Sequence, residues 1–371
     1  MELSIVMPCL NEADTIASCV ARALHSLAVA GVEGEVIVAD NGSTDDSAAL
    51  AAAAGARVVS VPARGYGNAL MSGIEAARGR FILMGDADAS YDFGAIEPFL
   101  ARLREGWELV QGCRLPAGGG WVAPGAMPWL HRWVGNPLFT LLARWWFGSP
   151  VHDTNCGLRA FTKELYRRLD QRCTGMEFAN EMLIKASLAR ARITEVPITL
   201  HPDGRKAHRP HLRTFRDGWR TLRFYLLFCP RWLFLVPGLG LMLLGVAGYA
   251  LTATAHAGNL GLVVASLLLL CGYQSVLFAF LTKAFAINEG LLPMNRRMAA
   301  FFRVMTLERG LVAGAVALAL GLAGLGLAAG QPPTRPEGAL QLAVPAATLA
   351  TLGFQTVLFS FFASLLGMRR R

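Results

Sequence analysis

Residues 81–88, Phe81-Ile82-Leu83-Met84-Gly85-Asp86-Ala87-Asp88, hold the pattern that decides the fold of this 371-residue chain. Four consecutive apolar residues are typical of a strand buried in a parallel sheet. Two carboxylates, two residues apart, come almost directly after that strand. Ligands of open α/β sheets bind at the carboxyl ends of the strands. We therefore expect Asp86 and Asp88 to line a pocket and to share a hard divalent cation, Mg²⁺ or Mn²⁺.

Apolar runs alternate with helical patterns on both sides of this motif, which predicts a mostly parallel α/β sheet. The predicted strands are Ser4–Met7, Glu35–Ala39, Arg57–Val61 and Phe81–Met84, and the predicted helices are Asp14–Ala30, Thr44–Ala54 and Gly67–Ala77. Polar residues follow three of the strands, namely Asn11 and Glu12, Asp40, and Asp86 with Asp88. Because the carboxyl ends of parallel strands meet at one edge of a sheet, these loops are expected to converge on one pocket.

The loop after the second strand reads Asp40-Asn41-Gly42-Ser43-Thr44-Asp45-Asp46-Ser47. Gly42 permits a turn, and Ser43 or Thr44 is expected to cap the next helix. These local roles do not explain Asp40, an acid placed directly after a buried strand. We interpret Asp40 as a hydrogen-bond acceptor for a nucleobase N–H or a ribose hydroxyl.

The last third of the chain is apolar enough to cross a membrane. Only 16% of all residues are charged and 54% are hydrophobic, whereas soluble proteins carry about 25% charged residues. A spanning helix needs about 20 mainly apolar residues, and four segments meet this length: Leu233–Thr254, Leu260–Thr282, Leu311–Gly330 and Leu340–Met368. We predict a soluble domain over residues 1–231 and an all-α membrane domain of four transmembrane helices over 232–371. Tight reversals are expected at residues 256–259 and 331–338.

Basic residues lie on one side of the predicted spans. They flank the first span, fill the middle loop and end the chain: Arg220, Arg223, Arg231, Arg296, Arg297, Arg303, Arg309 and Arg369–Arg371. Such loops face the cytoplasm, so the soluble domain and both termini are expected on the cytoplasmic side of the cell (inner) membrane. The third span carries glycines suited to close helix contact: Gly314, Gly321, Gly324, Gly326 and Gly330. Packing within the chain is favoured there over a homo-oligomer interface.

Several other classes of protein are disfavoured. The net charge is +9, but Arg and His crowd residues 205–231, where anionic lipid headgroups would lie, so nucleic acid is not an expected partner. The seven cysteines form no C-x-x-C pair, which favours reduced thiols over zinc or disulfides. No signal peptide is expected, because Ser4–Met7 already has the pattern of a strand. Gly65-Tyr66-Gly67 is interpreted as a helix-entry turn rather than a dinucleotide motif.

Taken in order, these motifs resemble those of the family 2 glycosyltransferases, which have a GT-A fold. The resemblance spans roughly Leu3–Arg231, and within the family the chain looks most like the polyprenyl-phosphate glycosyltransferases, such as dolichol-phosphate mannose and glucose synthases. The matching segments are Val6–Glu12, Asp40–Asp45, Gly85–Asp88, Gln111–Arg114, His131-Arg132, Gly135-Asn136, Asp153, Cys156–Phe161, Glu181-Met182, Glu195–Ile198 and Asp203–Lys206.

The resemblance implies a metal-dependent, inverting transferase that moves a hexose from a UDP- or GDP-sugar to a polyprenyl phosphate. It implies that the donor nucleotide is held by Pro8, Asn11, Glu12, Asp40 and Asp86. Asp86 and Asp88 would hold the metal and the diphosphate.

The resemblance also implies an acceptor side. Arg114, Arg132 and Arg205 would bind phosphate groups and act in catalysis with Asp88, and further site residues are Asp153, Arg159 and Glu181. Two residues depart from the family pattern: Asn41 stands where many relatives carry a second Asp, and Ser90 stands where mannose-type enzymes often carry Gln. The resemblance therefore does not identify the sugar or the nucleobase of the donor.

A lipid-phosphate acceptor needs no strong protein base, because a phosphate monoester with a second pKa near 6 is already mostly ionised at neutral pH. Glu181, which shares a helical face with Glu177, is then favoured as a positioning residue over a base. The segment 130–147, with Trp129, Trp133, Trp145 and Trp146, is interpreted as an interfacial helix, the alternative being a buried aromatic stripe. A second interfacial helix is expected over residues 211–229.

The basic loop Asp203–Lys206 with His208–Arg213 is interpreted as a lid over the diphosphate, the alternative being a solvated run of charges. Two other functions remain open at this point. The acceptor could be a lipid hydroxyl or a growing polysaccharide, although Trp219-Arg220 is not preceded by the Gln-x-x pattern of processive relatives. The chain could also be a membrane scaffold or flippase-like protein with an inactive transferase domain, which the intact Asp40, Asp86 and Asp88 disfavour.

Overall fold

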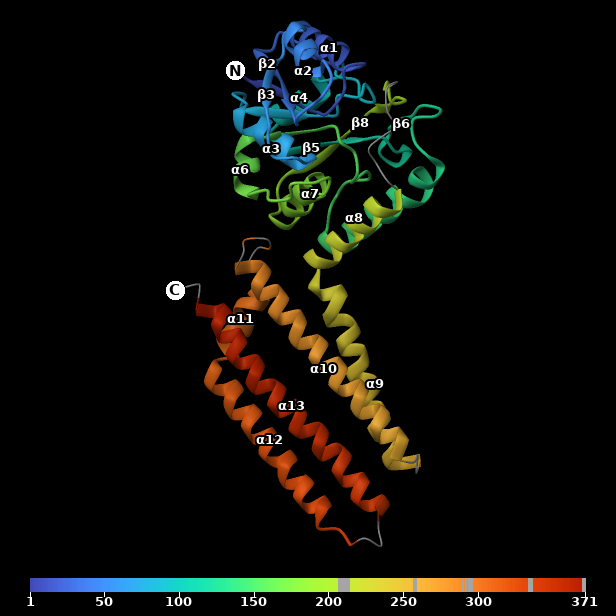
Figure 1. Cartoon of the computed structure of the whole chain (residues 1–371), viewed down its shortest axis with the longest axis vertical. Helices are drawn as coiled ribbons and strands as arrows, with labels where there is room; N and C mark the ends of the chain where they lie inside the picture. Colours follow the sequence, from blue (N-terminus) through green and yellow to red (C-terminus); the bar gives the residue numbers. More distant parts are fainter. Residues whose placement is uncertain are drawn as a thin grey trace. The chain divides into compact units, whose positions relative to one another are not determined.

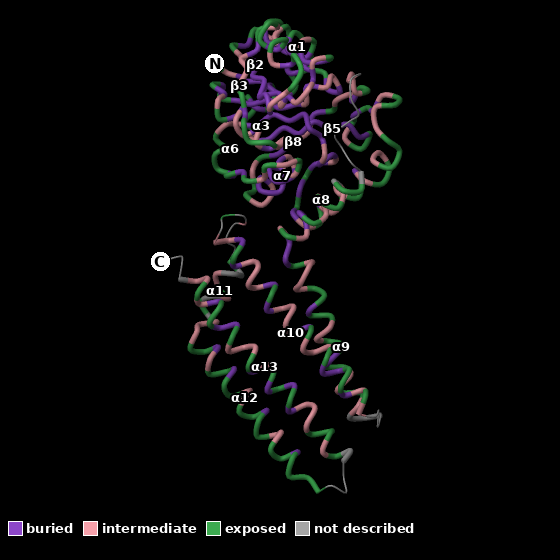
Figure 2. The backbone as a smooth tube through the Cα atoms, viewed as in Figure 1, coloured by how far each residue is buried: buried purple, intermediate pink, exposed green. Residues whose placement is uncertain are grey.

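The computed structural model describes residues 1–205, 214–255, 259–288, 290, 292, 296–332 and 336–368. The chain divides into two compact units, Met1–Tyr225 and Leu226–Arg371 (Figure 1). Buried residues concentrate in the strands of the first unit, whereas the long helices of the second unit are mostly exposed or half-buried (Figure 2). This contrast is expected when one unit folds around its own core and the other presents its apolar surface to lipid.

The first unit is built on a seven-stranded sheet of order β3-β2-β1-β4-β7-β5-β8. In chain order these strands are β1 Leu3–Cys9, β2 Gly34–Asp40, β3 Arg57–Ser60, β4 Phe81–Met84, β5 Leu109–Cys113, β7 Arg159–Thr162 and β8 Ile193–Pro197. Strand β7 runs antiparallel to β4 and β5, and the other pairs are parallel. The predicted mostly parallel α/β sheet is confirmed. A second, two-stranded sheet pairs β6 Trp121–Val122 with β9 Thr199–Leu200.

Helices cover both faces of the large sheet. Helices α1 Ile16–Val29, α2 Ser47–Ala53 and α4 Glu97–Arg104 pack on one face, and α3 Tyr66–Ala76, α6 Lys163–Leu169 and α7 Phe178–Leu188 pack on the other. The remaining helices are α5 Asn136–Phe147 and α8 Thr214–Phe228. Alternate strand residues divide between two cores, as the two-residue period of a strand requires. In β4, Phe81 and Leu83 pack with α1 and α4, whereas Ile82 and Met84 pack with α3, α6 and α7.

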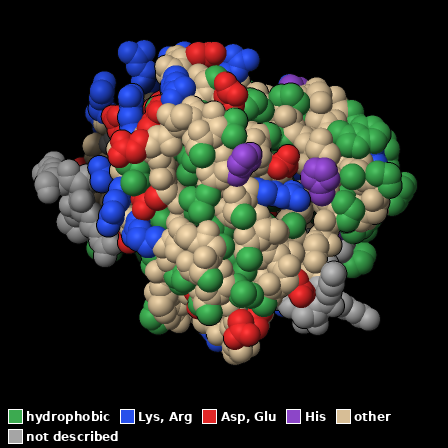
Figure 3. Space-filling model, turned by 90° about the horizontal axis from the view of Figure 1, so that it is seen from above, with side chains coloured by type: hydrophobic (Ala, Val, Ile, Leu, Met, Phe, Trp, Pro, Cys, Tyr) green, Lys and Arg blue, Asp and Glu red, His purple; other side chains and the backbone are tan. Residues whose placement is uncertain are grey.

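The outer surface of the first unit is charged. Lys and Arg side chains lie among Asp and Glu along one margin of the face shown in Figure 3. Five of the seven cysteines are buried and all seven are free thiols. Both observations fit a water-facing unit with a reduced core.

One local prediction was wrong. The N-cap of α2 is Asp46, without a side-chain capping hydrogen bond, and neither Ser43 nor Thr44 caps the helix. Ser43 Oγ instead accepts a hydrogen bond from the backbone N–H of Asn11 (3.0 Å), and the N–H of Thr44 donates to Asn11 Oδ1 (2.8 Å). The two polar residues therefore join the loops after β1 and β2 instead of ending a helix.

The second unit contains helices long and apolar enough to cross a membrane. A short π-helical turn, Arg231–Leu235, leads into α9 Val236–Ala255, followed by α10 Asn259–Asn288, α11 Arg296–Val304, α12 Leu307–Ala329 and α13 Pro336–Met368. The candidate spans within them are Arg231–Thr252, Asn259–Asn288, Leu307–Ala329 and Gly338–Gly367. Residues 256–258 and 333–335 of the predicted reversals lie outside the described residues, as do the terminal Arg369–Arg371.

Glycines bring α12 and α13 into close contact. A Cβ atom built on Gly321 would overlap the backbone nitrogen of Ala350, and one on Gly314 would lie 2.8 Å from the carbonyl oxygen of Gly353. Hydroxyl groups join other helices: Tyr249 bonds to Ser266 of α10 (2.6 Å) and to Thr348 of α13 (3.2 Å). The predicted small-residue surface of the third span thus packs, at Gly314 and Gly321, against α13 of the same chain.

We predict that Gly321→Ala destabilises the membrane unit by about 1–3 kcal/mol, because the added methyl group meets backbone atoms that cannot move aside easily. The matched control is Gly326→Ala on the same helix, where the new Cβ has no neighbour within 4 Å. Thermal unfolding of the full chain in detergent measures both variants. Equal midpoints for the two would contradict close packing at Gly321.

Candidate active site

The predicted acids converge at the carboxyl ends of three neighbouring strands. Strand β1 lies between β2 and β4, so the loops that carry Glu12, Asp40 and Asp86 leave the sheet side by side. The register sets their level, because Cys9 pairs with Asp40 and Val6 pairs with Met84. This is the edge at which open α/β sheets bind ligands.

Arg205 lies at the centre of an acidic cluster. Its Nη2 is 2.6 Å from Glu12 Oε1, and its Nη1 is 2.7 Å from Asp203 Oδ2 and 3.4 Å from Asp88 Oδ2. Burial alone would lower the pKa of Arg205, but the hydrogen bond to Glu12 and the negative charges around it raise that pKa. The structure thus brings together three of the predicted site residues, Glu12, Asp88 and Arg205, and adds Asp203.

Asp86 and Asp88 are both half-buried and have different partners. The hydroxyl of Tyr66 donates to Asp86 Oδ1 (2.9 Å). Burial and the neighbouring charge of Asp88 raise the pKa of Asp86 to about 6. Ser90 orients Asp88, since its Oγ (2.5 Å) and its backbone N–H (3.0 Å) both donate to Asp88 Oδ1.

The two carboxylates fit a magnesium or manganese ion that is shared with a substrate. In the part of the chain that the structure describes, no group of three or more His, Cys, Asp or Glu side chains could hold a metal. Mg²⁺ commonly binds through one or two carboxylates plus substrate phosphates. The acidic cluster already binds one positive charge, because the guanidinium of Arg205 contacts Asp88. Asp86 and Asp88 would therefore hold such an ion, and the remaining ligands would come from a diphosphate or water.

The residues expected at the nucleotide lie around the same edge. Both Asp40 carboxylate oxygens accept a hydrogen bond from the backbone N–H of Ser43 (3.2 and 3.3 Å). Pro8 is the next-to-last residue of β1. Asn11 has a positive φ of 59°, a conformation that few residue types adopt readily. Asn41 Nδ2 donates to the carbonyls of Val61 and Ala63 (3.1 and 2.8 Å). Asn41 therefore ties the loops together, a bonding pattern that an Asp could not provide.

Arg114 and Asp153 form a buried, two-pronged ion pair. Arg114 Nε is 2.7 Å from Asp153 Oδ2, and Nη2 is 2.9 Å from Oδ1. Burial and then the charge of Arg114 lower the pKa of His131, which indicates that the helix start at His131-Arg132 lies near this pair. Nε of Arg132 is buried without a hydrogen-bond partner in the described residues. The phosphate-binding roles of Arg114 and Arg132 stay predictions.

Arg159 and Glu181 lie inside the protein. Arg159 is fully buried, donates from Nη2 to the carbonyl of Cys156 (2.7 Å), and has its pKa lowered by burial. Glu181 is also fully buried, pairs with Lys185 (2.8 Å) and accepts from the backbone N–H of Cys173 (2.8 Å). Both side chains bond to backbone groups of nearby loops, Arg159 at Cys156 and Glu181 at Cys173.

Three of the four tryptophans in and before α5 are at the surface. Trp129, Trp133 and Trp145 are 69%, 58% and 61% exposed, so the alternative of a buried aromatic stripe is wrong for these three. Helix α8 packs on α5 through Tyr225, whose ring meets Phe147 edge-on at 5.5 Å between centroids. Residues 206–213, which include most of the predicted lid, lie outside the described residues.

Comparison with known proteins identifies the family. The model of glycosyl transferase family 2 matches residues 4–170, and that of the family 2 C-terminal transmembrane region matches residues 280–367. The low-salt glycan biosynthesis hexosyltransferase Agl6 of Haloferax volcanii is 39% identical, over 98% of this chain and 89% of its own. The chain belongs to glycosyltransferase family 2.

More distant relatives of this glycosyltransferase match about three fifths of the chain. A dolichyl-phosphate hexose transferase of Haloferax volcanii is 31% identical, over 58% of this chain and 89% of its own. Among solved structures, glucosyl-3-phosphoglycerate synthase of Mycobacterium tuberculosis, in complex with Mn²⁺, UDP and glucosyl-3-phosphoglycerate, superposes with a TM-score of 0.48 at 27% identity. That match covers 62% of this chain and 80% of that one.

Two functional contacts of the glycosyltransferase could not be found from sequence patterns. Tyr66 was interpreted as part of a helix-entry turn, yet its hydroxyl reaches Asp86, 20 residues away. Asp203 was noted only as part of a basic loop, yet its carboxylate shares Arg205 with Glu12. Neither contact has a local signal, because each depends on which loops lie side by side in the folded sheet.

We predict that Mn²⁺ binding weakens as pH falls through 6. Metal must displace the proton of Asp86, so affinity should fall about tenfold per pH unit below the pKa of that group and level off above it. Titration of the full chain with Mn²⁺ between pH 5 and 8, followed by electron paramagnetic resonance, measures this profile.

Two variants test which group titrates. Tyr66→Phe removes a hydrogen bond that lowers the pKa of Asp86, so the midpoint should move above 6. Asp86→Asn should bind Mn²⁺ weakly with little change between pH 5 and 8. A wild-type profile that is flat across this range would refute the assignment to Asp86.

Proposed function

We propose that this glycosyltransferase moves a hexose from a nucleoside-diphosphate sugar, with UDP or GDP, to a polyprenyl phosphate and inverts the configuration of the sugar. The observation that carries the proposal is the cluster of Glu12, Asp88 and Arg205 at the strand ends. This cluster of two acids and one cation supports a metal site beside a phosphate-binding side chain. Support for the acceptor comes from the related dolichyl-phosphate hexose transferase.

On the donor side, Pro8, Asn11, Glu12 and Asp40 would hold the nucleoside. Asp86 and Asp88 would hold the divalent ion, which supplies positive charge that makes the nucleoside diphosphate easier to expel. Arg205 is bound to carboxylates in the structure. When the diphosphate is present, Arg205 would turn from Asp88 to the phosphate oxygens, which its planar guanidinium can bind two at a time.

On the acceptor side, the lipid phosphate would attack the anomeric carbon directly, because it is already ionised near neutral pH. Glu181 is paired with Lys185 and fully buried, which favours a positioning role over proton transfer. Arg132, with its unpartnered Nε, is a candidate to receive the acceptor phosphate. Holding both reactants in line is the main source of rate in such a direct displacement.

The membrane would present the acceptor. Exposed Trp129, Trp133 and Trp145 are suited to the headgroup level of a bilayer, so residues 130–147 and 211–229 would lie at the interface. The catalytic domain would comprise residues 1–231 and the membrane domain residues 232–371. By the placement of the basic residues, the catalytic domain and both termini would be on the cytoplasmic side of the inner membrane.

Reconstitution of the full chain in nanodiscs tests the proposal. A panel of radiolabelled UDP- and GDP-hexoses with Mn²⁺ is expected to label added polyprenyl phosphate, giving an acid-labile, base-stable lipid. Chelation of the metal should abolish labelling. Labelling of a polyprenol or a glycolipid, but not of the polyprenyl phosphate, would establish a hydroxyl acceptor instead, and no turnover with any donor would favour a scaffold.

We predict that Arg205→Ala lowers kcat by about 10²–10³, the usual loss when one donor to developing negative charge is removed. The control is Arg102→Ala, which breaks an exposed i,i+3 ion pair with Glu105 and should leave turnover unchanged. Co-sedimentation with liposomes should be the same for both variants. An equal loss of turnover and membrane attachment in Arg205→Ala would show that the residue only binds lipid.

A further inference from the structure

Two adjoining pockets share residues of α6. The larger lies beside Arg80 and Thr162, where β4 begins and β7 ends, and the smaller lies between α3 and α6. The acids follow the other end of β4, about 13 Å away along that four-residue strand. One pocket holds about 410 Å³ and the other about 300 Å³, and both are lined by Lys163 and Arg167. Together they have the size of a small-molecule site.

The larger pocket, called here the arginine pocket, is defined by Arg78, Arg80, Lys163 and Arg167. The N-terminal residue Met1 also lines it, and Glu164 is its one acidic residue. Among the described residues, the side chains of Arg78, Arg80 and Arg167 have no ion-pair partner. Burial, and then the charge of Arg167, lower the pKa of Lys163, as expected where like charges crowd together. An anion of the phosphate class would relieve this repulsion.

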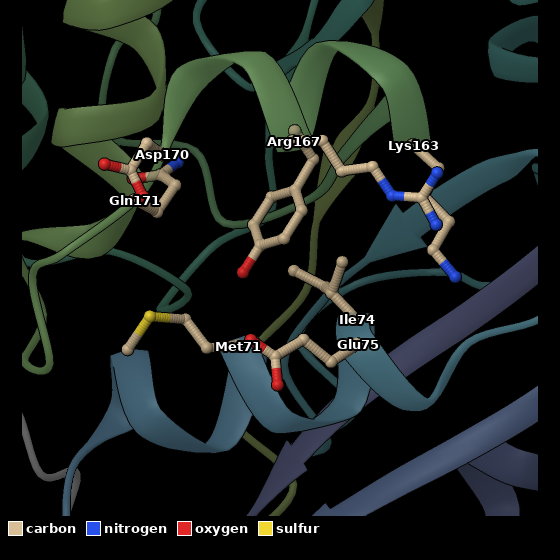
Figure 4. Close-up of a pocket in the computed structure, with 8 residues that line it drawn as sticks. Met71, Ile74, Glu75, Lys163, Arg167, Asp170 and Gln171 are labelled. Atoms are coloured by element: carbon tan, nitrogen blue, oxygen red, sulfur yellow. The ribbon is translucent and has the colours of Figure 1, made fainter.

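The smaller pocket, called here the glutamine pocket, is lined by Met71, Glu75, Tyr166, Asp170 and Gln171 in addition to the two shared cations. Figure 4 shows Asp170 and Gln171 at one end and Lys163 at the other, with Met71 and Glu75 of α3 along the facing wall. Gln171 is only 9% exposed, yet neither its Oε1 nor its Nε2 has a hydrogen-bond partner in the described part of the chain. A buried amide without partners is rare and needs an explanation, and a polar ligand that reaches it would provide the missing partners.

The two pockets are therefore suited to bind two chemically different ends of one molecule. The cations suit a phosphate group, and the Gln171 amide with the carboxylates of Glu75 and Asp170 suits hydroxyl groups at the other end. We propose that these pockets form a second binding site for a soluble phosphorylated, polyhydroxylated small molecule, of the hexose phosphate or nucleoside monophosphate class. This site is separate from the donor site and does not depend on the proposed transfer reaction.

Isothermal titration of the full chain with glucose 6-phosphate, UMP and inorganic phosphate tests the proposal. We expect saturable binding of at least one of the two organic phosphates. The double variant Arg78→Glu/Arg167→Glu should weaken it at least tenfold. The matched control, Arg22→Glu/Arg102→Glu, makes the same change of net charge at exposed positions outside both pockets and should have no effect.

Gln171→Leu separates the two halves of the site. This variant should weaken binding of the organic phosphate about three- to tenfold and leave binding of inorganic phosphate unchanged. Three outcomes would overturn the proposal: no saturable binding to the wild-type protein, equal losses in the pocket and control variants, or binding only to vesicles that contain anionic phospholipid. Each can occur whether or not the protein transfers a sugar.

Discussion

The parallel pairing of β1 with β2 and β4 is the constraint on which the rest of this glycosyltransferase depends. The backbone N–H of Gly85 still bonds to the carbonyl of Val6 (3.3 Å), and that of Asn41 bonds to the carbonyl of Cys9 (2.9 Å). These two bonds guide the Asp86 and Asp40 loops away from the sheet beside the end of β1. A shift of the pairing register by one residue would turn every side chain of a strand to the other face of the sheet. Such a shift would disrupt both hydrophobic cores and move the acids apart.

Much of the fold followed from local patterns, because its strands are apolar runs and its spans are long apolar helices. The position of Asp86 and Asp88 was also predictable, since the motif directly follows a buried strand. The partners of these acids were not. Arg205 reaches Glu12 across 193 residues of sequence, and Tyr66 reaches Asp86 because α3 begins beside β4. Such contacts are set by strand order and loop conformation, which periodicity does not encode.

The departure at Asn41 has a structural reason. Its side-chain amide donates to two carbonyls and accepts from the backbone N–H of Gly65 (2.7 Å), so it fastens the start of α3 to the end of β2. An Asp side chain would lose both donated bonds. The residue that differs from the family pattern is therefore part of the framework that places Tyr66, and through Tyr66 it supports Asp86.

The contacts of Arg205 have a consequence for the binding of cations at the acidic cluster. The carboxylates of Glu12, Asp88 and Asp203 would repel one another if no cation lay between them. The guanidinium of Arg205 neutralises this repulsion without a bound metal ion. A lone divalent cation must evict Arg205 without offering it another partner. A cation that is already chelated by a nucleotide would bring phosphate groups to which the displaced Arg205 could bind, so the proposed function favours joint binding of metal and nucleotide over binding of the metal first. Under the proposed function, the ion pairs of Arg205 would therefore disfavour binding of a lone cation and favour binding of a metal–nucleotide complex.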